Sequence, residues 1–226
     1  LCHVANTDGR RLPVKAAVEM ARARGVTTLI DGAQAIGVFP VDVGEIGADF
    51  YSGSAHKWLM GPAGVGFLVV KRSQLPHYNP IWSPTASEKA ISAGTRSEVG
   101  TPNHVSRLGA AYSLNLLQQI GLNTLEAQMG RLTRRLRDGL HAIPGIRNAG
   151  PDEWALSSSI TTLQLDNGTP ERCQQLVALL RERYAIVTKF RPEVCGVRVS
   201  VAAFNTAAEI DRLLEGLAGL VDEINI

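Results

Sequence analysis

Two stretches of the sequence decide the fold: VTTLIDGAQ at residues 26–34 and DFYSGSAHKWL at residues 49–59. Each contains a short run of β-branched, apolar or aromatic residues, which is typical of a strand. Small and polar residues follow each run and favour a turn. The first run ends at Asp31 and the second leads to Lys57. Because ligand crevices form where strands end, we expect the acid and the lysine to meet in one crevice.

An acid and a lysine in one crevice indicate pyridoxal phosphate chemistry. This cofactor requires an amine for a Schiff base, which Lys57 can supply. It also requires a carboxylate that keeps the pyridine nitrogen protonated, which Asp31 can supply. Glycines at 61, 64 and 66 let backbone N–H groups approach an anion, and Ser54 and His56 lie beside them as phosphate donors.

Each of these residues also has a simpler interpretation. Lys57 could be a solvated loop lysine, and the glycines could form the turn before the apolar run 67–70. Asp31 could be the N-cap of a helix over 32–36, with Gln34 in a capping box. From the residues alone these alternatives stay open.

The rest of the chain predicts an α/β fold. Short β-rich runs alternate with helical patterns, which indicates a mostly parallel sheet with crossover helices. Strands are expected at 1–5, 26–30, 49–52, 65–70, 159–165, 185–188 and 196–201. Helices are expected at 13–25, 104–119, 122–142, 170–183 and 210–221. The alternation of helices and strands changes near residue 120, which predicts a large domain at 1–120 and a smaller α+β domain at 121–226. The Pro-, Ser- and Gly-rich segment 75–102 is expected to be functional.

Composition excludes several classes of protein. The 226 residues are 45% hydrophobic and carry a net charge of +2, too small to indicate a nucleic-acid or membrane partner. Three distant cysteines indicate a reducing compartment rather than a disulfide framework. With no signal sequence and no apolar run long enough for a membrane span, a cytoplasmic location is expected. No metal site is predicted.

Several motifs together resemble the class V aminotransferase family, which is pyridoxal phosphate-dependent and includes cysteine desulfurases and isopenicillin N epimerase-like proteins. The resemblance rests on motifs in family order along nearly the whole chain: HVANTDG at 3–9, DGAQ at 31–34, DFY at 49–51, SAHKWL at 54–59, GPAGVG at 61–66, EVGTPN at 98–103 and VRVSVAAFNT at 197–206. It implies part of a fold type I large domain followed by a smaller C-terminal α+β domain.

The resemblance also implies roles for individual residues. Lys57 would hold pyridoxal 5'-phosphate as a Schiff base and move the Cα proton, while Asp31 would bind the pyridinium nitrogen. Gln34 would donate a hydrogen bond to the cofactor's phenolic oxygen. Ser54 and His56 would bind the phosphate, and Thr101 would reach it from the other subunit of a homodimer. Asn6 would orient the substrate, and Arg198 would bind the substrate α-carboxylate. A planar guanidinium suits that carboxylate, although Arg198 could also be a strand residue on a solvated face.

Two features depart from the family's pattern. Desulfurases carry a nucleophilic cysteine in a loop several residues before the C-terminal arginine, whereas Cys195 lies three residues before Arg198. Packing of Cys195 as a small hydrophobe is therefore expected. The family's N-terminal segment, which supplies further strands and a ring that stacks on the cofactor, is also expected to be missing from this chain.

The expected function is that of a pyridoxal phosphate-dependent epimerase, cysteine lyase or transaminase acting on a small amino acid. Two alternatives remain: a cysteine desulfurase, or a catalytically silent truncated homologue with a structural role. Retention of both Lys57 and Asp31 favours an enzyme, because a silent protein has no chemical need for the pair.

Overall fold

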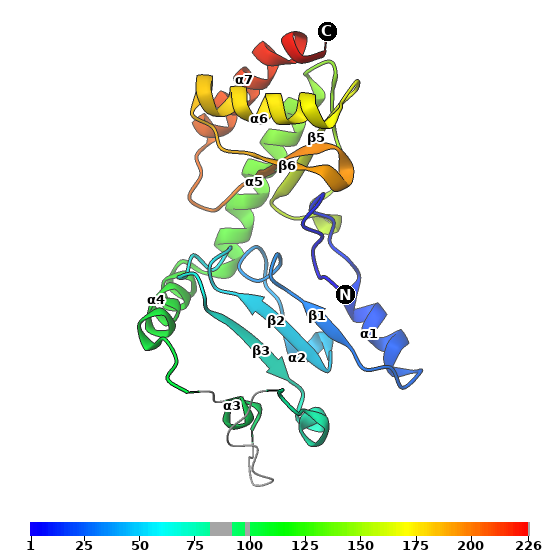
Figure 1. The fold of residues 1–226 in the computed structure, drawn as a ribbon, viewed down its shortest axis with the longest axis vertical. Coiled ribbons are helices and arrows are strands. Elements are labelled where there is room, and N and C mark those ends of the chain that lie inside the picture. Colours follow the sequence, from blue (N-terminus) through cyan, green and yellow to red (C-terminus); the bar gives the residue numbers. More distant parts are fainter. Residues whose placement is uncertain (82–91, 98–99, 226) are drawn as a thin grey trace. The chain divides into compact units, whose positions relative to one another are not determined.

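The computed structural model describes residues 1–81, 92–97 and 100–225. The chain forms two compact units (Figure 1). The first comprises residues 1–3, 13–36 and 41–119, and the second comprises residues 4–12, 37–40 and 120–226. The predicted domain boundary at residue 120 stays a prediction. None of the helices in the described residues is both long and apolar enough to cross a bilayer.

The first unit is built on a three-stranded sheet in the order β1-β2-β3. Its strands are β1 (Leu29–Asp31), β2 (Phe50–Ser54) and β3 (Gly66–Val70). β1 and β2 are parallel, as expected, whereas β3 is antiparallel to β2, so the sheet is mixed. The helices of this unit are α1 (Val14–Arg22), α2 (Val43–Ile46), α3 (Ala93–Arg96) and α4 (His104–Ile120), with a 3-10 helix, η1, at Arg72–His77.

The second unit is a four-stranded antiparallel sheet with helices packed against it (Figure 1). The strand order is β4-β5-β7-β6, and the strands are β4 (Ile146–Asn148), β5 (Ile160–Leu165), β6 (Lys189–Arg191) and β7 (Gly196–Ser200). The helices are α5 (Leu122–His141), α6 (Pro170–Tyr184) and α7 (Ala207–Asn225), with short 3-10 helices η2 (Trp154–Leu156) and η3 (Pro192–Val194).

Strand alternation gives the second sheet an apolar face and a polar face. Leu163 and Val197 point to the helices and belong to the core of the unit. Thr162 pairs with Arg198, which pairs with Lys189, so these three side chains share the opposite face. Fully buried leucines of the three helices complete the core, namely Leu132, Leu136, Leu140, Leu176, Leu180 and Leu217.

Two expected strands are wrong. Residues 1–5 form only isolated bridges of Cys2 with Asp31 and of Val4 with Arg11. The chain turns immediately afterwards, because the Gly9 N–H donates to the Ala5 carbonyl. Residues 185–188 end α6 instead of forming a strand: Ala185 is a left-handed cap, and the Ile186 N–H donates to the Leu180 carbonyl. The strand therefore begins at Lys189.

Asp49 joins the starts of β1 and β2 in the first unit. Its Oδ2 accepts hydrogen bonds of 2.9 Å from both the N–H and the hydroxyl of Thr28, and its Oδ1 accepts one of 2.9 Å from Gln74 Nε2. Partial burial alone would raise the pKa of Asp49, but these hydrogen bonds and the charge of Lys71 outweigh it and lower the pKa. The ionised carboxylate therefore stabilises this unit.

Asp49→Asn should weaken the pH dependence of stability in acid. Because the pKa is lower in the folded than in the unfolded state, the carboxylate stabilises the fold above about pH 4, and this contribution is lost as the pH falls through the folded pKa. Urea unfolding should show the variant about 1 kcal/mol less stable at neutral pH and nearly equal to wild type at about pH 3. Asp222→Asn, at an exposed position of α7, is the control. An equal deficit at both pH values would contradict this role for Asp49.

Candidate functional site

The turns that follow β1 and β2 are joined to each other. Asp31 pairs with Ser52 in the parallel register, and the Gly32 N–H donates to the Ser52 carbonyl over 2.8 Å. Beyond the strands, Trp58 Nε1 donates to Gln34 Oε1 over 2.9 Å. The turn after Asp31 and the turn that contains Lys57 therefore lie side by side at the same sheet edge.

Asp31 presents an exposed carboxylate at this edge. Its Oδ1 accepts a 2.9 Å hydrogen bond from the Ala33 N–H, and its Oδ2 accepts none from a described residue. The alternative helix over 32–36 is a single turn, because the Ala35 and Ile36 N–H groups both donate to the Gly32 carbonyl and Gly37 then takes a positive φ of 92°. Asp31 therefore caps a turn, and one of its oxygens remains available.

Tyr51 lies beneath the Asp31 turn. It is fully buried, and its hydroxyl shares a 2.9 Å hydrogen bond with Nδ1 of the buried His3. A Cβ added at Gly32 would lie 2.1 Å from the Tyr51 ring, so only glycine fits there. Burial, and then the negative charge of Asp31, raise the pKa of Tyr51, which keeps the phenol protonated. Neither Tyr51 nor His3 was predicted to have a role.

The indole of Trp58 fixes the orientation of the Gln34 amide. An indole N–H is a donor, so the atom that it contacts must be the amide oxygen. The amide NH2 of Gln34 is then left as a donor, and it makes no hydrogen bond to a described residue. The contact of this group with the phenolic oxygen of the cofactor stays a prediction. Trp58 was not predicted, although its place directly after Lys57 was a possible signal.

The turn around Lys57 offers donors without partners among the described residues. Lys57 is half-buried and forms no ion pair with them, and Ser54 and His56 lie within three residues. The backbone N–H groups of His56 and Lys57 donate to none of these residues either. The turn closes tightly, with Met60 at a positive φ of 55° and the Gly61 N–H donating to the Ala55 carbonyl. Such a turn can hold an anion such as a phosphate.

Thr101 is exposed three residues before α4 begins. Glu98 and Val99, which were part of the predicted motif, lie outside the described residues. Residues 82–91 of the expected functional segment 75–102 also lie outside them. The contact of Thr101 with a partner subunit therefore stays a prediction.

Asn6 and Arg198 belong to the second unit, whereas the other six predicted residues belong to the first. Arg198 Nη1 donates to the Asn6 backbone carbonyl over 3.2 Å, so these two residues are together. Burial and the neighbouring Arg191 lower the pKa of Arg198, while Glu193 raises it to a smaller extent. Arg191, which was not predicted, donates to the side-chain oxygen of Asn6.

Cys195 lies in the short connection between β6 and β7. It ends η3 in a left-handed conformation with φ 45°, and its thiol is 3.7 Å from the Gly168 carbonyl. The backbone carbonyl of Cys195 is 3.5 Å from the thiol of Cys173. Burial, then proximity to Cys195, raise the pKa of Cys173 to about 11. Packing of Cys195 as a hydrophobe remains a prediction.

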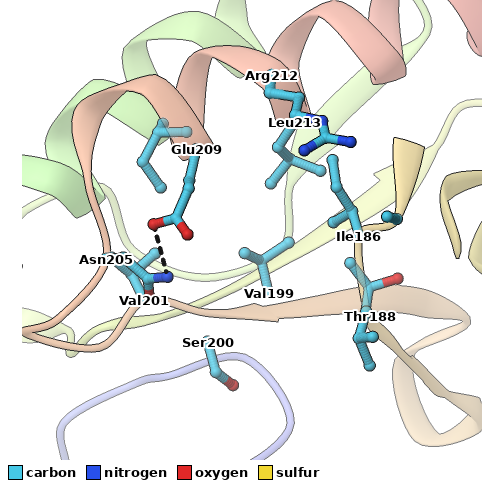
Figure 2. Close-up of a pocket in the computed structure, with 12 residues that line it drawn as sticks. Ile186, Thr188, Val199, Ser200, Val201, Asn205, Glu209, Arg212 and Leu213 are labelled. Carbon is cyan, nitrogen blue, oxygen red and sulfur yellow. Dashed lines mark hydrogen bonds between the residues drawn. The ribbon is translucent and has the colours of Figure 1, made fainter.

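A cavity of about 220 Å³ in the second unit contains none of the predicted site residues (Figure 2). Val199 and Val201 line it from the helix-facing side of β7, opposite to the face of Arg198. The Asn205 amide donates to Glu209, which also accepts from the Thr206 N–H, so these groups cap α7. The cavity is therefore a poor candidate for the substrate site. No cluster of three metal-ligating side chains occurs among the described residues.

Comparison with protein families places the chain in a known family. The family model described as Aminotransferase class-V matches residues 1–213. Isopenicillin N epimerase of Streptomyces clavuligerus is 32% identical over 238 aligned residues, which cover 98% of this chain and 59% of that protein. A cysteine desulfurase of Klebsiella pneumoniae is 34% identical over 238 residues, covering 96% and 56%. The chain thus spans less than two thirds of the length of these relatives.

Solved structures confirm the predicted fold class. The apo structure of cysteine desulfurase from Thermococcus onnurineus NA1 superimposes with a TM-score of 0.86 at 24% identity, covering 98% of this chain and 59% of that one. A mutant of C-DES with glycine covalently linked to its PLP cofactor superimposes with a TM-score of 0.86 at 26% identity, covering 96% and 59%. Both matches extend over the two units.

Proposed function

Because the chain belongs to the class V aminotransferase family, we propose that it is part of a pyridoxal phosphate-dependent enzyme that acts on a small amino acid. The hydrogen bond between Gln34 and Trp58 carries the proposal, since it joins the turn of Asp31 to the turn of Lys57. An acid and an amine are thereby presented at one sheet edge, as this cofactor requires.

The residues at this edge fit the cofactor. Asp31 keeps one carboxylate oxygen free of described partners and can accept from a protonated ring nitrogen. Gln34 presents its NH2 group as a donor for the phenolic oxygen. Ser54, His56 and the unpaired backbone N–H groups after them can hold a phosphate. Lys57, which has no ion-pair partner among the described residues, can hold the carbonyl group of the cofactor covalently.

When bound, the cofactor supplies an electron sink for bonds at the substrate Cα. Asp31 keeps that sink effective by holding the ring proton, and Tyr51 packs beneath the Asp31 turn. The Lys57 amine would accept the Cα proton of the substrate and return it. Arg198 would hold the α-carboxylate. Epimerase, lyase and transaminase reactions share these steps and differ in the fate of the substrate after the Cα proton has been removed.

Lys57→Ala should abolish covalent retention of the cofactor. The purified protein incubated with pyridoxal phosphate should absorb at about 400–430 nm, and borohydride reduction should fix the cofactor to the peptide that contains Lys57. Mass spectrometry after proteolysis checks the site of attachment, and Lys71→Ala is the control at an exposed lysine. Absence of the absorption band, or its persistence in Lys57→Ala, would refute the proposal and favour a silent, structural homologue.

Cysteine desulfurase activity is the second candidate, favoured by the identity of 34% to a desulfurase. If Cys195 is a packing residue, Cys195→Ser should leave turnover within about twofold of wild type, because the substitution changes a packing contact near the protein surface. The assay would measure the sulfide released from cysteine, with and without a reductant, and the pyruvate or alanine that is formed. A persulfide on Cys195 in the wild type, lost in Cys195→Ser together with sulfur release, would establish a desulfurase.

A homodimer is also proposed, and α4 supports it. Val105, Leu108 and Tyr112 are 82, 60 and 69% exposed and lie on one face of the helix, which begins three residues after Thr101. A second copy covering this face would also receive Thr101, as expected for a site that two subunits share.

Leu108→Lys should weaken the dimer, because it places a charge in an apolar interface. Sedimentation velocity of the purified wild-type protein should show a dimer. Leu108→Lys should raise the dissociation constant of this dimer at least tenfold, which is equivalent to about 1.4 kcal/mol. Gln118→Lys, on another side of α4, is the control. A monomeric wild type, or equal effects of the two variants, would contradict the proposal.

A further inference from the structure

Two thiols that are 22 residues apart in the sequence lie against each other in the second unit. Cys173 is in the first turn of α6, and Cys195 lies in the connection between β6 and β7. The Cys173 thiol donates to the Cys195 carbonyl over 3.5 Å, and the side chains of the two residues are hydrogen-bonded to each other. The Cys195 thiol also donates to the Gly168 carbonyl, over 3.7 Å. Both cysteines are free, so the fold holds two reduced sulfur atoms in contact.

The two thiols differ in exposure. Cys173 is completely buried in the core of the unit, whereas Cys195 is partly exposed and packs against that core. Burial, and then the proximity of Cys195, raise the pKa of the Cys173 thiol to about 11, so Cys173 remains protonated near neutral pH. A reagent from solution therefore meets the sulfur of Cys195 first, and the Cys173 thiol lies behind it.

The turn that carries Cys195 is closely packed. A Cβ added at Gly196 would lie 2.8 Å from the Leu163 carbonyl oxygen, so this glycine packs directly on β5. Cys195 itself has a positive φ of 45°, a conformation that glycine adopts at less cost. A residue with a side chain is nevertheless present here, and its sulfur contacts the other thiol. The backbone thus keeps the two sulfur atoms together.

The third cysteine offers an internal comparison. Cys2 is partly exposed, as Cys195 is, but it belongs to the first unit, whereas Cys173 and Cys195 belong to the second. Solvent access alone would expose Cys2 and Cys195 to the same reagents. A reaction that joins Cys195 to Cys173 would therefore reflect the contact between these two residues.

We propose that Cys173 and Cys195 form a site of reversible oxidation, which hydrogen peroxide converts into an intramolecular disulfide. In the first step the Cys195 sulfur takes one oxygen from the peroxide, whose O–O bond breaks, and becomes a sulfenic acid while one water leaves. In the second step the Cys173 sulfur attacks the Cys195 sulfur, the S–O bond breaks, and the Cys173 proton leaves with the hydroxyl group as a second water. The two thiols lose two electrons together, and one peroxide is reduced to two molecules of water.

The disulfide has two consequences for the second unit. It links the first turn of α6 covalently to the connection between β6 and β7, and it protects the Cys195 sulfur from further, irreversible oxidation. A dithiol reductant reverses it by thiol–disulfide exchange, so in a reducing compartment the pair stays reduced until peroxide appears. This inference does not depend on the proposed function.

The test treats the purified, fully reduced protein with hydrogen peroxide after the reductant has been removed. Titration of thiols in the denatured protein should fall from the three groups that the sequence contains to one, and dithiothreitol should restore all three. Peptide mapping without reduction should find the peptides of Cys173 and Cys195 joined, and a non-reducing denaturing gel should show a single chain. Absence of the joined peptide, a link between chains, or a link through Cys2 would overturn the proposal.

Three variants separate the roles of the thiols. Cys2→Ser should form the joined peptide as wild type does. Cys195→Gly removes the exposed thiol and suits the left-handed backbone, so it should fold and leave Cys173 unoxidised. Cys173→Ala should leave the oxidised Cys195 without a partner, so that its oxidation continues to the sulfinic acid. Oxidation of Cys173 to the same extent in Cys195→Gly as in wild type would contradict the proposal.

Discussion

The parallel pairing of β1 with β2 is the constraint on which the candidate site depends. Parallel strands that are neighbours end at the same sheet edge, so the residues after them must come together. The register places Asp31 beside Ser52, and the chain then needs only a few residues to reach Lys57. An antiparallel arrangement would have sent the two turns to opposite edges. The mixed sheet contains such a pair in β2 and β3, and no predicted site residue lies on β3.

Close packing beneath this edge makes the Asp31 turn rigid. Gly32 is in contact with the Tyr51 ring, and Tyr51 is held by His3 from a segment 48 residues away in the sequence. Because burial and the charge of Asp31 raise the pKa of Tyr51, the phenol stays protonated and is a neutral support for the Asp31 turn. The Asp31 carboxylate is thereby held in place at the sheet edge while it faces solvent.

The sequence predicted those parts of the site that depend on local pattern. Asp31 and Lys57 come after β-rich runs that predict strands, and the parallel direction of those strands brings the two residues to one edge. The strand expected at 185–188 is wrong because Ala185 ends α6 in a left-handed conformation that its residue type does not favour, and the Ile186 N–H donates to the Leu180 carbonyl of the helix. Contacts between distant segments carried no local signal. The hydrogen bond between Gln34 and Trp58 and the hydrogen bonds of Asn6 with two arginines are examples of such contacts.

Arg137 shows how the second unit accommodates a buried guanidinium group. Arg137 is fully buried without a buried carboxylate beside it, and all three of its nitrogens donate hydrogen bonds. Its acceptors are neutral: the side chains of Thr161 and Ser157 and the carbonyls of residues 152, 158 and 160. Desolvation lowers the pKa of Arg137, so its charge is retained through this complete set of partners. A buried arginine in the second unit is thus held by neutral acceptors that neighbouring segments of the chain supply, and these contacts join α5 to β5 and to the loop before it.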